Sequence, residues 1–234
     1  MRRTYIFSII LVALVFIPRV LSQGGQDETS RTVAGGGVTV PGWTGKVDAR
    51  EASQGMTLNN AKFAKEGDAF HIVTGPAVTY WNAGNKASGD YTVTAHFREP
   101  KFMNLNTHPH PYGVMIAGND LGTDQQTYLY CAAYGDGKFI VRGFGPAPFQ
   151  MNGRGTPDSA VNKASAVGQP VEQEIAISVK GDKVSCSINN KEVWSGAKSD
   201  LVSAGKLKST DGLYGLRSAH NTEVFVTRLK MTKD

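Results

Sequence analysis

The chain is poor in cysteine, in long hydrophobic runs and in helical patterns, and each scarcity narrows its class. Two cysteines among 234 residues exclude a small fold held by several disulfides, and no zinc-binding spacing is present. The longest apolar run, residues 5–17, is shorter than the about 20 residues that span a bilayer. Phosphate-binding glycine loops and the motifs of serine or cysteine nucleophiles are absent. Nucleotide-binding enzymes and nucleophilic hydrolases of the common types are therefore not indicated.

The amino terminus has the three parts of a secretory signal peptide. Arg2 and Arg3 precede the apolar run, and Val20-Leu21-Ser22 provides aliphatic and small residues before a cleavage point. We expect residues 1–22 to be removed, leaving Gln23 as the mature amino terminus; the alternative is an uncleaved anchor. The sequence thus predicts export to the periplasm, the cell surface or the medium.

Net charge gives no indication of a nucleic-acid partner. The formal charge is +5, but three arginines and no acid lie in the predicted signal peptide. Its removal leaves an excess of about two basic residues, far from the basic patch that nucleic-acid binding requires. We therefore expect no nucleic-acid partner and, after cleavage, no membrane span; the oligomeric state is left open.

Two segments with different compositions follow the signal peptide. Residues 23–37 are polar and glycine-rich with almost nothing to bury, which predicts a flexible leader. Residues 38–234 are numerous enough to bury a sizeable core, and sandwiches of this length are commonly one domain. We predict a single domain over residues 38–234.

The strongest local signal is a hairpin over residues 127–145. Two runs rich in tyrosine, valine, isoleucine and phenylalanine flank Gly135-Asp136-Gly137, and Asp-Gly tolerates the positive φ angles of a tight turn. Residues 91–98 alternate apolar and polar side chains, as do the runs around Gly181-Asp182. About a dozen such short strands predict an all-β sandwich or jelly roll of two antiparallel sheets. The best helical candidates are residues 158–167 or a turn near residues 200–205. Residues 145–168 have no sustained period, and we predict a long surface loop there.

The order of several motifs resembles a known family. Residues 89–99 (GDYTVTAHFRE), 111–118 (PYGVMIAG), 174–194 (EIAISVKGDKVSCSINNKEVW) and 212–231 (GLYGLRSAHNTEVFVTRLKM) are similar to the bacterial secreted 3-keto-disaccharide hydrolase domains. That family belongs to the concanavalin A-like lectin/glucanase superfamily of laminin-G-like jelly rolls. The resemblance covers about residues 42–233 and implies a jelly-roll sandwich whose concave sheet meets ligand. The family's arginine in the middle segment is missing after Met115-Ile116.

Laminarinase-type relatives carry a Glu-x-Asp-x-x-Glu strand that places two carboxylates on one face. The only approach to it is residues 66–71, EGDAFH. This stretch lacks the third acid and straddles a turn, so we do not expect that mechanism.

Polar and aromatic side chains supply candidate ligand contacts. His96 and Arg98 share the polar face of their strand and could contact sugar hydroxyls, with His96 as acid or base, or could simply be solvated. Tyr128 and Tyr130 share one face of the next hairpin and form either a stacking platform or core. The remaining ligand-binding candidates are Arg142, Arg217 and Trp81, and His220 is the second catalytic candidate. We expect His96, Arg98, Tyr128, Tyr130 and Arg142 to meet on one sheet face.

Metal binding is expected only weakly. Asn119, Asp120 and Asp124 could offer oxygen ligands to Ca²⁺, but the same residues also form ordinary turns. A proline follows both His108 and His110, and we interpret this stretch as a rigid loop that spreads the two rings apart rather than as a metal site. No cofactor is expected apart from this possible calcium ion.

Cys131 and Cys186 both lie in strand patterns with small neighbours, and export favours a disulfide between them over two buried thiols. Three functions stay open. The first is a secreted carbohydrate-binding domain for a glycan or small sugar. The second is a hydrolase or lyase of 3-keto-glucosides, and the third is a non-catalytic protein-interaction domain.

Overall fold

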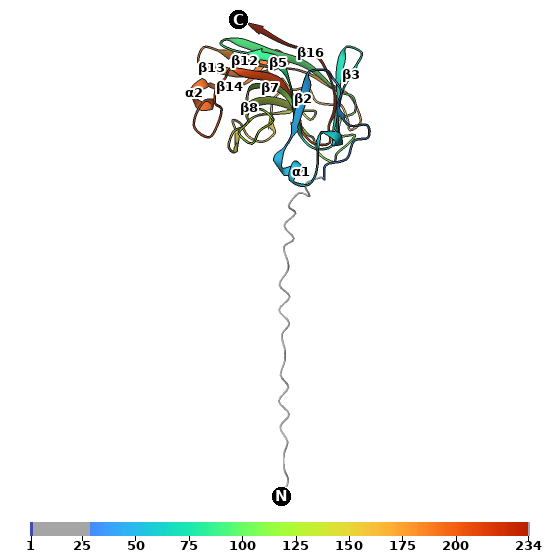
Figure 1. The fold of residues 1–234 in the computed structure, drawn as a ribbon. Coiled ribbons are helices and arrows are strands. Elements are labelled where there is room, and N and C mark those ends of the chain that lie inside the picture. The colour runs from blue at the N-terminus through green and yellow to red at the C-terminus, as the bar shows by residue number, and fades with distance from the viewer. Residues whose placement is uncertain (2–28, 234) are drawn as a thin grey trace.

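The fold is known from a computed structural model that describes Met1 and residues 29–233. The predicted cleavage point and the rest of the signal peptide lie outside the described residues. Two β-sheets stack with a shared core (Figure 1). The short helix α1 (Ala49–Ser53) and the end of the last strand lie at opposite ends of the molecule. The prediction of an all-β sandwich of two antiparallel sheets is confirmed.

The first sheet has eight strands. In spatial order they are β1 (Gly37–Val38), β3 (Ala61–Glu66), β4 (Ala69–Thr74), β16 (Glu223–Lys233), β6 (Tyr91–Glu99), β12 (Val171–Lys180), β13 (Lys183–Ile188) and β14 (Lys191–Ala197). The pairing of β1 with β3 is parallel and the other pairings in this sheet are antiparallel.

The second sheet carries the predicted hairpin. Its spatial order is β10 (Pro148–Gln150), β9 (Lys138–Phe144), β8 (Thr127–Tyr134), β7 (Tyr112–Asn119), β15 (Gly212–Ser218), β5 (Val78–Ala87) and β2 (Trp43–Val47), and β11 (Thr156–Pro157) also pairs with β9. The turn Gly135–Gly137 joins β8 to β9, where Tyr134 pairs with Lys138. Two short helical turns complete the fold, η1 (Leu58–Asn60) and α2 (Lys198–Leu201).

Strand parity sets the core between the sheets. On β6 the inward residues Tyr91, Val93, Ala95 and Phe97 are fully buried, as their alternation with polar residues predicts. The facing layer comes from the second sheet and includes Leu129 and Cys131 of β8. Burial of apolar area at about 25 cal/mol per Å² is the main force that holds the two layers together.

A disulfide joins the two layers through this core. Cys131 of β8 and Cys186 of β13 are bonded, with their Cα atoms 6.1 Å apart. Both residues are almost completely buried. This is the bridge expected from the sequence, and it ties the second sheet covalently to the first.

The described part of the glycine-rich segment, residues 29–37, makes hydrogen bonds to the domain. The Arg31 amide donates to Asn221 Oδ1 at 2.9 Å, and Asn221 Nδ2 donates to the Thr29 carbonyl at 3.2 Å. Gly37–Val38 adds a parallel strand to the first sheet. The Asn221 side chain and the pairing of β1 with β3 therefore connect this segment to the domain.

Two further expectations were wrong in detail. The stretch 145–168 contains the short strands β10 and β11 and buries Ala160, Val161 and Ala164, so it packs on the domain instead of forming only a surface loop. Residues 158–167 contain no helix, whereas the alternative expectation of a turn near residues 200–205 is met by α2 and the turn that follows it. The helix α1 forms where none was expected. The secondary structure of such short segments depends on the surface against which they pack. The local sequence does not specify that surface.

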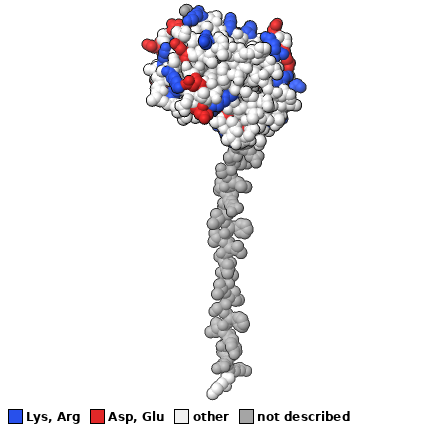
Figure 2. Space-filling view, viewed as in Figure 1, with Lys and Arg blue, Asp and Glu red and all other residues white. Residues whose placement is uncertain are grey.

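Charges are dispersed over the domain. In Figure 2 basic and acidic side chains alternate on the visible face without one extended patch of either sign. Across Met1 and residues 29–233, no helix combines the length and the apolarity of a membrane span.

Glu99 places a carboxyl group at the end of the core face of β6. Its side chain is 7% exposed, and its Oε1 accepts a hydrogen bond from the Met103 amide at 3.2 Å. Burial raises the pKa of Glu99 from 4.5 to about 7, and the Met103 hydrogen bond offsets only part of this effect. At neutral pH a fraction of the molecules therefore holds Glu99 protonated.

We expect Glu99→Gln to stabilise the protein in alkaline solution. Because the folded pKa lies above the unfolded one, the folded state binds the extra proton between pH 4.5 and 7, and wild-type stability falls as pH rises through that window. The variant should therefore be more stable than wild type by about 3 kcal/mol at pH 8 and equal to it near pH 4. Urea unfolding at several pH values measures this difference, and a difference that does not depend on pH contradicts the prediction.

Candidate functional site

The face of the second sheet that points away from the shared core carries an aromatic cluster. On β8, Leu129 and Cys131 belong to the core between the sheets, whereas Tyr128 and Tyr130 pack with Trp81 and Ile140 on the opposite face. The parity predicted for the tyrosine stripe is therefore correct. The rings of Tyr128 and Phe144 stack with centroids 4.9 Å apart.

A hollow of about 860 Å³ opens over this face, within the about 300–1,000 Å³ of small-molecule sites. Its floor comes from β8, β9 and β15, and its rim from α1, from the loop before β7 and from the loop after β15. The side chains that line the hollow include Asp48, Glu51, His108, His110, Tyr130, Tyr134, Arg142, Phe144, Arg217 and His220.

Arg217 lies at the floor and is 6% exposed. Its guanidinium forms a two-pronged ion pair with Asp48 at 2.6 and 2.5 Å, and it also donates to Thr79 Oγ1 at 3.1 Å. Burial alone lowers the pKa of Arg217, but the charge and hydrogen bonds of Asp48, together with the Tyr128 and Tyr130 phenols, outweigh it and hold that pKa well above the ordinary value. The cation is therefore permanent, and Asp48 neutralises it.

Aromatic rings surround this cation and form one wall of the hollow. The Arg217 guanidinium lies 5.6 Å from the Tyr130 ring centroid and 5.4 Å from that of Phe144. The half-buried Arg142 also lies over this wall, with its guanidinium carbon 5.3 Å from the Phe144 ring centroid. Burial raises the pKa of Tyr130, and that of Tyr134 to about 12, so both phenols stay neutral hydrogen-bonding groups at ordinary pH.

The opposite wall is made of histidines. The rings of His108 and His110 have centroids 4.3 Å apart, and those of His110 and His220 are 4.0 Å apart. The expectation that the prolines spread the two rings is wrong. Side chains at positions i and i+2 of an extended backbone point to the same side, and the prolines fix that extended backbone.

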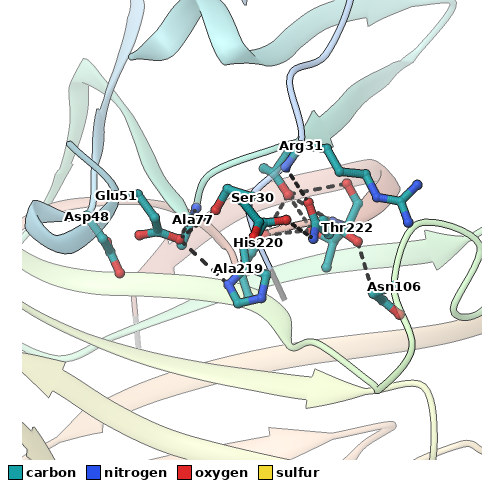
Figure 3. A network of polar contacts seen from close by, with 12 residues as sticks. Ser30, Arg31, Asp48, Glu51, Ala77, Asn106, Ala219, His220 and Thr222 are labelled. Atoms are coloured by element: carbon teal, nitrogen blue, oxygen red, sulfur yellow. Dashed lines mark hydrogen bonds and ion pairs between the residues drawn. The ribbon is translucent and has the colours of Figure 1, made fainter. Parts of the chain in front are cut away.

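Two loops that carry these histidines are tied together by hydrogen bonds. Asn106 Nδ2 donates to the Asn221 carbonyl at 2.8 Å, and the Ala219 amide donates to the Pro111 carbonyl at 3.0 Å. Figure 3 shows Asn106 and Thr222 beside the loop that carries His220. Asn221 has a φ of 51°, a left-handed conformation that asparagine tolerates better than most residues.

Glu51 of α1 lies behind His220. Its Oε1 is 3.6 Å from His220 Nδ1 and accepts a hydrogen bond from the Ala77 amide at 3.1 Å (Figure 3). Burial raises the pKa of Glu51, but the interactions with His220 and Ala77 outweigh it and hold that pKa below the ordinary value. The carboxylate is therefore ionised and orients the His220 ring.

The structure brings several of the predicted site residues together. Tyr130, Arg142, Arg217 and His220 all line the hollow. Tyr128 and Trp81 lie on the same sheet face, but they are buried among their neighbours at 0% and 7% exposure. Thr79 donates to the Tyr128 hydroxyl at 2.9 Å, so Tyr128 supports the floor.

His96 and Arg98 do not join this face. They lie on β6 in the first sheet, whereas Tyr128, Tyr130 and Arg142 lie on β8 and β9 in the second. Both pair with Glu172 of the neighbouring strand, His96 at 3.3 Å and Arg98 at 3.4 Å. The expectation of one shared face is therefore wrong, because strand parity assigns a side chain to a face of its own sheet and not to a particular sheet.

The weak calcium candidates lie at the loop between β7 and β8. Asp120 pairs with Lys208, and Asp124 lies 3.3 Å from Lys46 Nζ. Asn119 Nδ2 donates to the Ala117 and Asp211 carbonyls at 3.1 and 2.9 Å. These side chains therefore have protein partners, and calcium binding here stays a prediction.

Sequence reasoning missed Asp48, Glu51 and the two histidines as site residues. No local pattern marks Asp48 or Glu51, because their partners Arg217 and His220 lie about 170 residues away along the chain. For His108 and His110 a signal did exist. Two histidines at i and i+2, each before a proline, predict neighbouring rings on one side of an extended segment.

The comparisons with known proteins place the fold. No protein-family model matches the chain, and no curated protein is similar to it in sequence. Carbohydrate-binding module CBM66 from Bacillus subtilis is similar in structure, with a TM-score of 0.54 at 11% identity over 84% of this chain and 99% of that one. A Bacillus subtilis protein of unknown function with a galectin-like fold is also similar, with a TM-score of 0.52 at 12% identity. The match covers 82% of this chain and 89% of that one.

A glycoside hydrolase also appears among the structural neighbours. The endo-β-1,3-glucanase from Pyrococcus furiosus gives a TM-score of 0.48 at 12% identity, over 86% of this chain and 91% of that one. At identities this low the likeness shows the fold alone. The chain thus has a jelly-roll sandwich fold similar to that of the carbohydrate-binding module and of the galectin-like protein, and the narrower resemblance to 3-keto-disaccharide hydrolases rests on its sequence motifs.

Proposed function

We propose that the chain is an exported carbohydrate-binding jelly-roll domain whose ligand occupies the hollow over β8, β9 and β15. The observation that carries this proposal is the wall of half-buried Tyr134 and Phe144 beside Arg142, with the buried ring of Tyr130 (3% exposed) packed behind them. Ring faces pack against the apolar face of a sugar, and guanidinium and phenol groups hydrogen-bond its hydroxyls. The predicted signal peptide and the disulfide between Cys131 and Cys186 both fit an exported protein.

The arrangement of charge indicates which residue meets the ligand first. Arg217 is neutralised by Asp48 and lies at the floor, whereas Arg142 is half-buried and lines the hollow. Donors of Arg142 can therefore be used by a ligand without breaking a buried ion pair. The structural neighbours include a carbohydrate-binding module, and this likeness supports the proposal that the domain binds a sugar.

We expect Arg142→Ala to weaken sugar binding by about 10- to 100-fold, because a charge-assisted hydrogen bond contributes about 1.5–3 kcal/mol. A glycan screen of residues 23–234 identifies the sugar, and calorimetric titration then compares the variant with wild type. Arg98→Ala is the matched control, since Arg98 lies on the other sheet, and its affinity should stay at the wild-type value. Failure of every glycan to bind, or equal affinities for Arg142→Ala and wild type, contradicts the proposal.

A second function is favoured by one observation, the contact of Glu51 with His220 in the hollow. A histidine oriented by a carboxylate can act as general base or acid, which suits a hydrolase or lyase acting on 3-keto-glucosides. Product analysis in the same screen, with glucosides and 3-keto-glucosides as substrates, separates this function from binding alone. Binding to a protein surface without any sugar is the third outcome.

A further inference from the structure

Three of the chain's five histidines converge on one wall of the hollow. Each of His108, His110 and His220 offers a ring nitrogen, and these atoms lie within 4.8 Å of one another. A tetrahedral Zn²⁺ with bonds of about 2.1 Å holds its nitrogens about 3.4 Å apart, so small rotations of the rings complete the set. We propose that His108, His110 and His220 bind one divalent transition-metal ion of the zinc class.

The surroundings of His220 fix the tautomer that metal binding requires. Nδ1 faces the Glu51 carboxylate at 3.6 Å, and this arrangement favours a ring proton on Nδ1 and a lone pair on Nε2. Nε2 is buried and has no hydrogen-bond partner within the described part of the chain. A carboxylate beside one ring nitrogen of a histidine is the usual outer partner when the other nitrogen binds a metal.

The cluster is also held in place before any ion arrives. His108 and His110 share a short segment in which a proline follows each of them. The hydrogen bonds from Asn106 to Asn221 and from Ala219 to Pro111 join this segment to the loop of His220. Preorganised ligands lose less conformational entropy on binding. The geometry therefore suits an ion better than three independently mobile rings would.

The type of ligand atom selects the class of ion. Imidazole nitrogens suit zinc, copper, nickel and iron, whereas calcium and magnesium prefer oxygen. The nearby carboxylates are already engaged, Asp48 with Arg217 and Glu51 with Ala77 and His220. The site is thus chemically distinct from the weak calcium candidates at the loop between β7 and β8.

Three protein ligands leave a fourth tetrahedral position for water or for an oxygen of a ligand. All three histidines line the hollow, so this position faces the space in which we propose that the sugar binds; this step rests on the proposed function. His220 Nε2 has a single lone pair, so metal binding and a role of His220 as general base exclude one another.

The test is metal binding by the purified protein after treatment with EDTA, with no sugar present. Titration with Zn²⁺ against a coloured chelator should give one ion per chain, and Co²⁺ should give the visible absorption of a four-coordinate complex. We expect His108→Ala and His220→Ala each to lower Zn²⁺ affinity about 100-fold, and Glu51→Gln to lower it about 10- to 100-fold. Because His108 is exposed, its replacement leaves the core intact.

His96→Ala is the matched control, because it removes a histidine from the other sheet and should leave Zn²⁺ affinity unchanged. Circular dichroism verifies the fold of each variant. Absence of stoichiometric Zn²⁺ binding, or equal affinities of His108→Ala and wild type, overturns the proposal. Neither result depends on sugar binding, so failure of the metal site and failure of the proposed function are distinguishable.

Discussion

Arg217→Met lowers the free energy of unfolding by about 3–5 kcal/mol, the expected cost of breaking a buried ion pair from one side. The Arg217 side chain is 7% exposed and that of Asp48 is 19% exposed. Methionine fills much of the space but leaves the Asp48 carboxylate without its counter-charge and Thr79 without its donor. Urea unfolding at pH 7 measures the difference.

A double-mutant cycle with Asp48→Asn shows whether the ion pair causes this loss. The double variant leaves no uncompensated charge, so it should be clearly more stable than the sum of the two single effects implies. Arg98→Met is the control at the surface. Its pair with Glu172 is half exposed, and its loss should cost less than about 1 kcal/mol. An Arg217→Met effect as small as that of Arg98→Met contradicts the role assigned to the buried pair.

The second large effect is expected from the disulfide. Cys131 and Cys186 are 55 residues apart in the sequence, and a cross-link that closes a loop of this length stabilises the folded state by about 4 kcal/mol through the entropy of the unfolded chain. Cys131→Ala with Cys186→Ala should therefore unfold at a temperature lower by about 10 °C, since about 1 kcal/mol corresponds to about 2–4 °C for a domain of this size.

Two comparisons separate the cross-link from the packing of the sulfur atoms. Wild type in a reducing agent keeps both side chains but loses the bond, and it should be destabilised nearly as much as the alanine pair. A variant with valine at both positions restores part of the buried volume and should remain destabilised. Equal stability of oxidised and reduced wild type would show that the bridge contributes nothing.

Local signals in the sequence were sufficient for the strands and their turns. Asp136-Gly137 marks the β8–β9 turn, and Asn189 and Asn190 have φ values of 49° and 65° in the β13–β14 turn, as two-residue hairpins require. The alternation of Tyr91, Val93, Ala95 and Phe97 shows correctly which side of β6 is buried. Period-two burial is a property of each strand alone, so a single sequence is enough to read it.

The same parity predicted part of the candidate site. Tyr130 and Arg142 share a face because β8 and β9 are neighbours in one hairpin, and that pairing follows from the turn. Arg217 and His220 were identified from the closing motif, and they also line the hollow. Which of these residues meets a ligand is not a local property, because it depends on the tertiary packing that buries Tyr128 and Tyr130 and leaves Arg142 half-exposed beside the hollow.

What the sequence by itself determined is the set of strands, their inward faces, the tight turns and the two cysteines fit to bond. Only the tertiary structure decided which sheet each strand joins. That choice separates His96 and Arg98 from the aromatic face and brings Asp48 to Arg217 and Glu51 to His220 across about 170 residues. The physical reason is that strand pairing and loop packing are set by contacts between distant segments, and each segment's own pattern is compatible with more than one neighbour.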